Sequence, residues 1–220
     1  MKLTTAQLNK IYAILKKYSK KLQVPVAELI EQETHDQFKV LLGGVLSART
    51  KDETTAKACG KLFKKIKKPG DFEKYSIKEI EKLIYPVGFY KTKARNLKKL
   101  GKQLTEEFNS KIPNTLKELI LLPGAGRKTA NLVLAVAFKK QAICVDTHVH
   151  KIMNRMGYVK TKNPFETEKE LMQKLPKKLW RKTNYLFVAF GQNLCVPISP
   201  FCSKCPIEKY CKRINVKKSR

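Results

Sequence analysis

Residues 116–138 read LKELILLPGAGRKTANLVLAVAF, and this stretch decides the fold. An apolar helical pattern is interrupted by Pro123, Gly124 and Gly126 and then resumes, which predicts two helices joined by a tight hairpin. Both glycines can adopt positive φ and expose backbone N–H groups, and the second helix adds its N-terminal amides. This arrangement suits one phosphate group, with Arg127 beside it, although a plain packing corner would use the same residues.

The charge of the chain points to a polyanionic partner. Its 220 residues include 47 Lys+Arg against 18 Asp+Glu, a formal net charge of +29. Nucleic acid is the first candidate for that partner, and an anionic membrane surface is the second. The sequence has no apolar run long enough to span a bilayer and no signal-peptide core. We therefore expect a cytoplasmic or nucleoid-associated protein with no membrane segment.

The remaining chain also predicts helices, so we expect an all-α fold. Leu97, Leu100 and Leu104 have the spacing of an apolar helix face. The motif SIKE at 76–79 is a capping box, which predicts the start of a helix. Two further helices are predicted at 163–175 and 178–191, with Gly191 placed to end the second one. The run AICV at 142–145 is long enough for a short strand, but an apolar lead into a helix is the simpler interpretation.

Four cysteines near the C-terminus form the clearest candidate metal site. Cys195, Cys202, Cys205 and Cys211 have the spacing C-x6-C-x2-C-x5-C. Four thiolates suit either Zn²⁺ or an iron–sulfur cluster. One tight pair with two wider gaps favours a [4Fe–4S] cluster over zinc, and a disulfide pair is the least favoured alternative. Two more cysteines lie in apolar context and are predicted to be ordinary buried thiols: Cys59 and Cys144.

Lysines are interleaved with these cysteines. Lys204 and Lys209 would be displayed by a metal-pinned loop, which predicts contacts with DNA phosphates. The general abundance of lysine in the chain explains them equally well, and both interpretations stay open.

The segment VDTHVHKIMNRMG at 145–157 predicts another short helix. Asp146 stands where an N-cap belongs, and Gly157 stands where the residue after the C-cap belongs. Taken alone, Asp146 is a helix cap and nothing more.

Together these motifs resemble the endonuclease III family of DNA repair glycosylases, within the helix-hairpin-helix superfamily. The resemblance is carried by LPGAGRKTA at 122–130, by VDTH at 145–148 and by the four-cysteine loop, in that order. The upstream stretches LLGGVLSARTKDETT at 41–55 and VGFYKTKARNL at 87–97 extend it over nearly the whole chain. It implies two helical domains with a DNA cleft between them. A six-helix domain at 30–140 would end with the hairpin, and 1–29 plus 141–220 would hold the cluster.

The resemblance also implies an activity, a partner and two catalytic residues. The partner is duplex DNA with damaged pyrimidines or abasic sites, and the damaged nucleotide is flipped out of the stack. Lys128 corresponds to the family's nucleophile, which attacks C1′ and leads to a strand nick by β-elimination. Its amine must be neutral, so we expect it to be desolvated and flanked by cations. Asp146 corresponds to the carboxylate that stabilises the cationic sugar.

Two further residues lie in stretches that match family loops inserted into DNA. Arg49 stands where the family usually has glutamine, which puts the preferred lesion and opposing base in doubt. Phe89 follows Gly88 in a predicted loop, and a buried core position is its simpler interpretation. The rival functions are a mismatch or adenine glycosylase of the same superfamily, and a non-catalytic DNA-binding or redox-sensing iron–sulfur protein. We expect the protein to act as a monomer.

Overall fold

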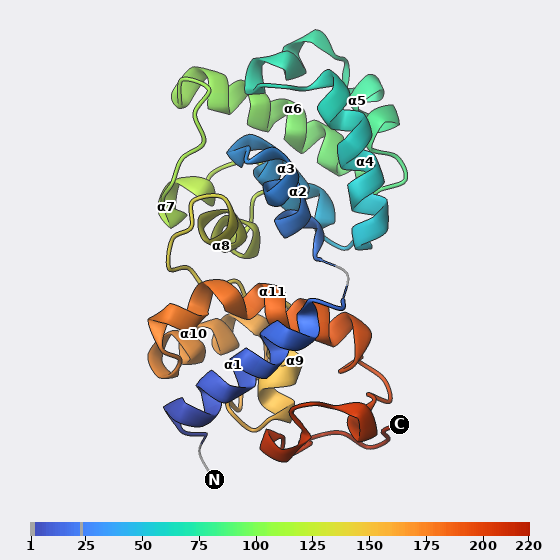
Figure 1. Ribbon diagram of the computed structural model, residues 1–220. Coiled ribbons are helices and arrows are strands. Elements are labelled where there is room, and N and C mark those ends of the chain that lie inside the picture. The colour runs from blue at the N-terminus through green and yellow to red at the C-terminus, as the bar shows by residue number, and fades with distance from the viewer. Residues whose placement is uncertain (1–2, 23) are drawn as a thin grey trace. The chain divides into compact units, whose positions relative to one another are not determined.

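The computed structural model describes residues 3–22 and 24–220, and Figure 1 shows its course. Every regular element in the described residues is an α-helix or a 3-10 helix, so the all-α prediction is confirmed. The run at 142–145 is not a strand. Among the described residues, we find no helix with the length and apolar character needed to cross a membrane. The chain divides into two compact units, one of residues 26–140 and one of residues 1–25 with 141–220.

The unit of residues 26–140 is built around one buried helix. Its elements are α2 (Val26–Thr34), α3 (Gln37–Ser47), α4 (Asp52–Lys65), η1 (Pro69–Lys74), α5 (Ile77–Ile84), α6 (Tyr90–Glu107), α7 (Leu116–Leu119) and α8 (Arg127–Val136). Helix α3 is buried along most of its length and packs against α2, α4, α6 and α8. We expected this unit to begin at residue 30, but α2 begins at Val26 and packs on α3. All of α2 therefore belongs to this unit.

Local sequence signals account for several helix ends. Ser76 Oγ accepts a hydrogen bond from the Glu79 N–H at 3.3 Å, and the Glu79 carboxylate accepts the Ser76 N–H at 2.7 Å. The predicted capping box therefore forms and starts α5. Gly157, with φ of +72°, follows the end of α9 as expected.

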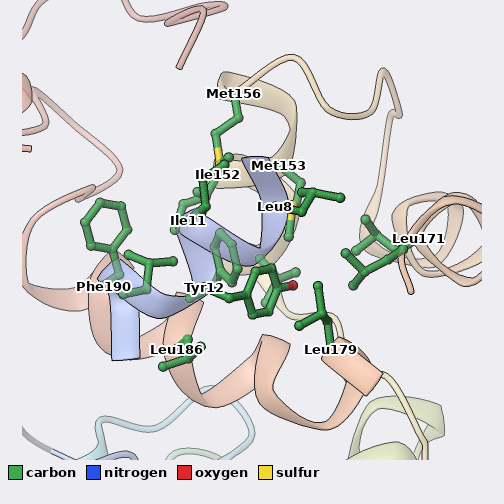
Figure 2. Close-up of a cluster of buried hydrophobic side chains, with 14 of the residues drawn as sticks. Leu8, Ile11, Tyr12, Ile152, Met153, Met156, Leu171, Leu179, Leu186 and Phe190 are labelled. Atoms are coloured by element: carbon green, nitrogen blue, oxygen red, sulfur yellow. The ribbon is translucent and has the colours of Figure 1, made fainter. Parts of the chain in front are cut away.

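The second unit has its own apolar core. Its elements are α1 (Thr5–Ser19), α9 (Thr147–Arg155), α10 (Pro164–Lys174), α11 (Lys177–Asn193), η2 (Cys202–Lys204) and η3 (Glu208–Tyr210). Figure 2 shows α1 seated on this core, with Leu8, Ile11 and Tyr12 directed into it. The Tyr12 hydroxyl lies 2.7 Å from Thr183 Oγ1 of α11 inside the core. Helix α1, near the start of the chain, thus packs in one core with helices from the last third of the chain.

Gly191 does not end its helix, contrary to the sequence expectation. Helix α11 continues to Asn193, and a Cβ atom on Gly191 would lie 2.5 Å from His148 Nδ1. The glycine is needed for a close approach of α9 to α11 and not for a turn. This packing holds α9, which begins next to Asp146, firmly against α11.

Candidate functional site

The hairpin at 122–126 positions the start of α8. Gly124 has φ of +83° and provides the left-handed turn, as expected. Gly126, which could also have adopted positive φ, has an ordinary φ of −71°. The space around Gly126 is open, because a Cβ atom there would meet no other atom, and no side chain caps α8. The first-turn amides of α8 are therefore accessible to an anion such as a phosphate.

Lys128 and Arg127 are the first two residues of α8, and both are exposed. The next residue, Thr129, is buried against α3, where a Cβ on Gly44 would lie 2.9 Å from Thr129 Cγ2. This packing fixes the backbone that carries Lys128. The expected desolvation of the Lys128 amine is wrong for the DNA-free protein, because Lys128 is exposed there.

A carboxyl group that the sequence did not single out lies near Lys128. Burial raises the pKa of Glu28, on α2, to about 7, and the charge of Asp52 adds to this effect while Lys128 and Lys139 oppose it. Glu28 Oε2 is buried and has no hydrogen-bond partner among the described residues. In the sequence, VAELI at 26–30 is an ordinary amphipathic stretch, so no local signal distinguishes this glutamate.

Asp146 is the N-cap of α9. Its Oδ1 accepts hydrogen bonds from the His148 and Val149 N–H groups, both at 2.9 Å. Oδ2 has no hydrogen-bond partner in the part of the chain that the structure describes, and the residue is half-buried. The predicted cap is confirmed, and one carboxylate oxygen remains for a second role. Lys128 belongs to the unit of residues 26–140, whereas Asp146 belongs to the other unit.

The structure brings Arg49 and Phe89 together, which the sequence did not predict. Arg49 Cζ lies 5.5 Å from the centre of the Phe89 ring. Both residues have positive φ, 53° and 57°. The Phe89 side chain is 61% exposed, so the buried-core interpretation is wrong. A flat guanidinium and an aromatic ring thus form one exposed pair on adjacent loops.

The four C-terminal cysteines line a single pocket, together with Arg155 and Ile207 among others. The Arg155 guanidinium donates to Cys195 Sγ at 3.3 Å, and Cys211 Sγ lies 3.5 Å from the Arg155 carbonyl oxygen. Burial, with smaller contributions from the neighbouring cysteines, raises the pKa of the Cys205 thiol to about 11. Four thiolates in this pocket would repel one another unless a cationic group lay between them.

No group of three or more His, Cys, Asp or Glu side chains within residues 3–22 and 24–220 has the arrangement of a single-ion site. Cys59 and Cys144 are buried cysteines outside any disulfide of the described residues, as expected. Lys204 lies in η2 and Lys209 in η3, and both are exposed on the cysteine loop. The Lys209 ammonium lies 5.2 Å from the centre of the Tyr210 ring.

Comparison with known proteins gives consistent matches over most of the chain. The model of the "HhH-GPD superfamily base excision DNA repair protein" family matches residues 42–177. Endonuclease III of Thermotoga maritima is 45% identical over 177 residues, which cover 80% of this chain and 83% of that protein. A non-covalent endonuclease III–DNA complex matches with a TM-score of 0.85 at 35% identity, covering 96% of each chain. A trapped endonuclease III–DNA covalent intermediate matches with a TM-score of 0.84 at 35% identity, covering 96% of this chain and 97% of that one.

Proposed function

Because the chain belongs to the endonuclease III family of HhH-GPD base excision repair proteins, we propose that it removes oxidised pyrimidines and nicks DNA through Lys128. The protein is a DNA glycosylase and AP lyase that acts on duplex DNA. The lesion class and the residue roles are our proposal. The observation that carries it is the exposed Lys128 in the first, uncapped turn of α8, directly after the glycine hairpin.

The proposed role of the hairpin is to hold a backbone phosphate. Gly126 leaves the first-turn amides of α8 open, and the helix dipole favours a negative charge there. Arg127 adds a positive charge. This contact is independent of base sequence, so it fixes the register of the DNA and leaves lesion choice to other residues.

The proposed chemistry begins with a flipped nucleotide. The neutral Lys128 amine attacks C1′, and the C1′–N bond breaks with its electron pair moving to the base, which takes up a proton. The amine loses one proton, and the C1′–O4′ bond then breaks with its electron pair moving to O4′, which takes up a proton and leaves a protonated Schiff base. Removal of a C2′ proton then breaks the C3′–O bond and nicks the strand. Entry of the flipped nucleotide would exclude water from Lys128, which is solvated in the free protein.

Asp146 is proposed to stabilise the positive charge that develops on the sugar as the base departs. Its Oδ1 is held by the two N–H groups of α9, and Oδ2 is left to face the substrate. A side chain fixed by a helix cap needs no reorganisation during the reaction.

We further propose that Cys195, Cys202, Cys205 and Cys211 hold a [4Fe–4S] cluster. The support is that all four thiols line one pocket and that Arg155 ties the chain around it to α9. The cluster would supply structural bracing for the loop that displays Lys204 and Lys209 as phosphate contacts.

A borohydride trap on abasic duplex DNA tests the proposed function. The wild-type protein should form a covalent adduct and a nick, whereas Lys128→Gln should bind the same DNA and form neither. Lys117→Gln, the same exchange at an exposed position of α7, is the matched control and should behave as wild type. An adduct with Lys128→Gln would mean that another amine is the nucleophile. No adduct with any variant would favour the non-catalytic alternative.

A further inference from the structure

Lys93 is a buried lysine that the proposed chemistry does not use. It lies in the first turn of α6 and is only 7% exposed. Its Nζ donates to the Leu46 carbonyl oxygen at 2.7 Å and to the Ala48 carbonyl oxygen at 2.6 Å. A third hydrogen bond reaches Thr50 Oγ1 at 3.2 Å. All three donor positions of the ammonium are therefore used by one short segment.

These bonds close the C-terminal end of α3, which ends at Ser47. The last carbonyl groups of a helix have no partner within the helix and carry the negative end of its dipole. A buried ammonium satisfies them and complements the dipole. Burial lowers the pKa of Lys93 to about 8, whereas its three acceptors favour the charged form. An apolar side chain would avoid the cost of burying a charge, so the lysine must contribute something that packing cannot.

That contribution concerns the backbone on both sides of Arg49. Two of the three acceptors belong to its neighbours, Ala48 and Thr50, so the ammonium spans the residue. Arg49 itself has φ of +53°, an uncommon conformation for a residue with a Cβ atom. The ammonium thus fixes the turn in which this conformation occurs.

The same contacts include the loop that carries Phe89. The Gly88 N–H donates to Thr50 Oγ1 at 3.1 Å, so Thr50 joins both loops to Lys93. A Cβ on Gly88 would lie 2.6 Å from the Arg49 carbonyl oxygen, so only glycine allows this approach. The Lys93 N–H also donates to the Phe89 carbonyl oxygen at 3.0 Å. Lys93 therefore contacts both loops, through its side chain and through its backbone.

We propose that Lys93 is a positioning residue that holds Arg49 and Phe89 together as one element for entering the DNA stack. The inference rests on the proposed function, in which this pair fills the space left by a flipped nucleotide. Without the Lys93 ammonium, the two loops would lose the hydrogen bonds that set the spacing between them. The loss would affect recognition of a damaged site and leave phosphate contacts intact.

The test is Lys93→Met, compared with Lys98→Met. Lys98 lies on the same helix, and its Nζ donates to three carbonyl groups: Phe72 at 2.9 Å, Glu73 at 3.2 Å and Tyr75 at 2.6 Å. It is therefore the same kind of backbone clamp in a segment remote from Arg49 in the sequence. Binding is measured to undamaged duplex and to duplex with one tetrahydrofuran abasic analogue, with 2-aminopurine opposite the analogue to report insertion by its fluorescence.

We expect Lys93→Met to lose about 10 to 100-fold of its preference for the analogue, because small misplacements have effects of that size. The fluorescence change should be lost with it, while binding to undamaged duplex stays unchanged. Lys98→Met should keep both the preference and the fluorescence change. Equal behaviour of the two variants would overturn the inference.

Two features of the assay make its result independent of the role assigned to Lys128. The tetrahydrofuran analogue forms no Schiff base, and the assay is repeated in a Lys128→Gln background. The comparison of Lys93→Met with Lys98→Met would therefore still test the inference if Lys128 were not the nucleophile. If Lys93→Met does not fold by its melting curve, Thr50→Val is used instead, since it removes the oxygen shared by Lys93 and Gly88. An unchanged preference in a folded Thr50→Val protein would then count against the inference.

Discussion

Arg49 and Phe89 lie 40 residues apart in the sequence, yet the Arg49 guanidinium carbon is 5.5 Å from the centre of the Phe89 ring. The contact joins a flat cation to an exposed aromatic face. Both groups can stack on DNA bases, and the guanidinium can also donate two hydrogen bonds to a guanine edge. The pair therefore offers a physical basis for sensing the base opposite a lesion.

We predict that Arg49→Gln changes the dependence of cleavage on the opposing base. The wild-type protein should favour guanine opposite an oxidised pyrimidine, because glutamine pairs with the guanine edge less well than arginine does. The measurement is the cleavage rate on one lesion placed opposite each of the four bases. Arg95→Gln, at an exposed position of α6, is the control and should keep the wild-type profile. A flat profile for both wild type and Arg49→Gln would reduce Arg49 to another phosphate contact.

Asp146→Asn should fold normally and turn over slowly. An asparagine oxygen can still cap α9, but the negative charge that stabilises the sugar cation is gone. Asp36→Asn is the matched control, since Asp36 caps α3 through the Phe38 and Lys39 N–H groups in the same way. Melting curves and single-turnover rates should show similar stability for both variants and a lower rate for Asp146→Asn alone. A mainly unfolded Asp146→Asn protein would mean that the cap role dominates.

The purified protein should be yellow-brown and contain iron and acid-labile sulfide in equal amounts. Cys202→Ala should lose both, together with much of the folded cysteine loop, because metal binding and folding of such loops are coupled. Cys59→Ala removes a buried thiol from the other unit and should retain the colour. A colourless and fully active protein that carries one zinc ion would contradict the cluster assignment.

Glu28→Gln should make stability less dependent on pH. The folded-state pKa of Glu28 is raised from 4.5 to about 7, so the folded state favours the neutral acid. The stability from this preference is fully present below pH 4.5 and is lost as the pH rises through about 7. Melting curves should show Glu28→Gln gaining about 1 to 3 kcal/mol relative to wild type at pH 8, with little gain near pH 4.5. Glu33→Gln, on the exposed face of the same helix, should show no such trend.

Binding to undamaged duplex should weaken steeply with salt, because the net charge of +29 implies several displaced counterions. Each neutralised phosphate adds about −0.9 to the slope of log K against log salt. Replacing Lys204 and Lys209 with glutamine should therefore make the slope shallower by up to about 1.8. An unchanged slope would show that lysine abundance explains these two residues, and a wild-type slope near zero would exclude nucleic acid as the main partner.

Short-range features were predictable because they depend on a few neighbouring residues. The capping box at Ser76, the N-cap at Asp146 and the left-handed turn at Gly124 follow from local hydrogen bonding and sterics. The sequence also held a signal for Lys93, which lies four residues before Leu97 on the apolar stripe of α6. A lysine on a buried helical face requires buried acceptors, but their identity is not a local property.

The amino-acid sequence by itself determined the helical class, the hairpin, the cysteine spacing and the family, because each follows from local patterns and motif order. Only the tertiary structure decided that Gly191 admits His148 instead of ending a helix, that a buried carboxyl oxygen of Glu28 lies near Lys128, and that Arg49 contacts Phe89. These relationships depend on which helix faces come together. Such packing results from the whole core being filled at once, so no single segment of sequence contains it.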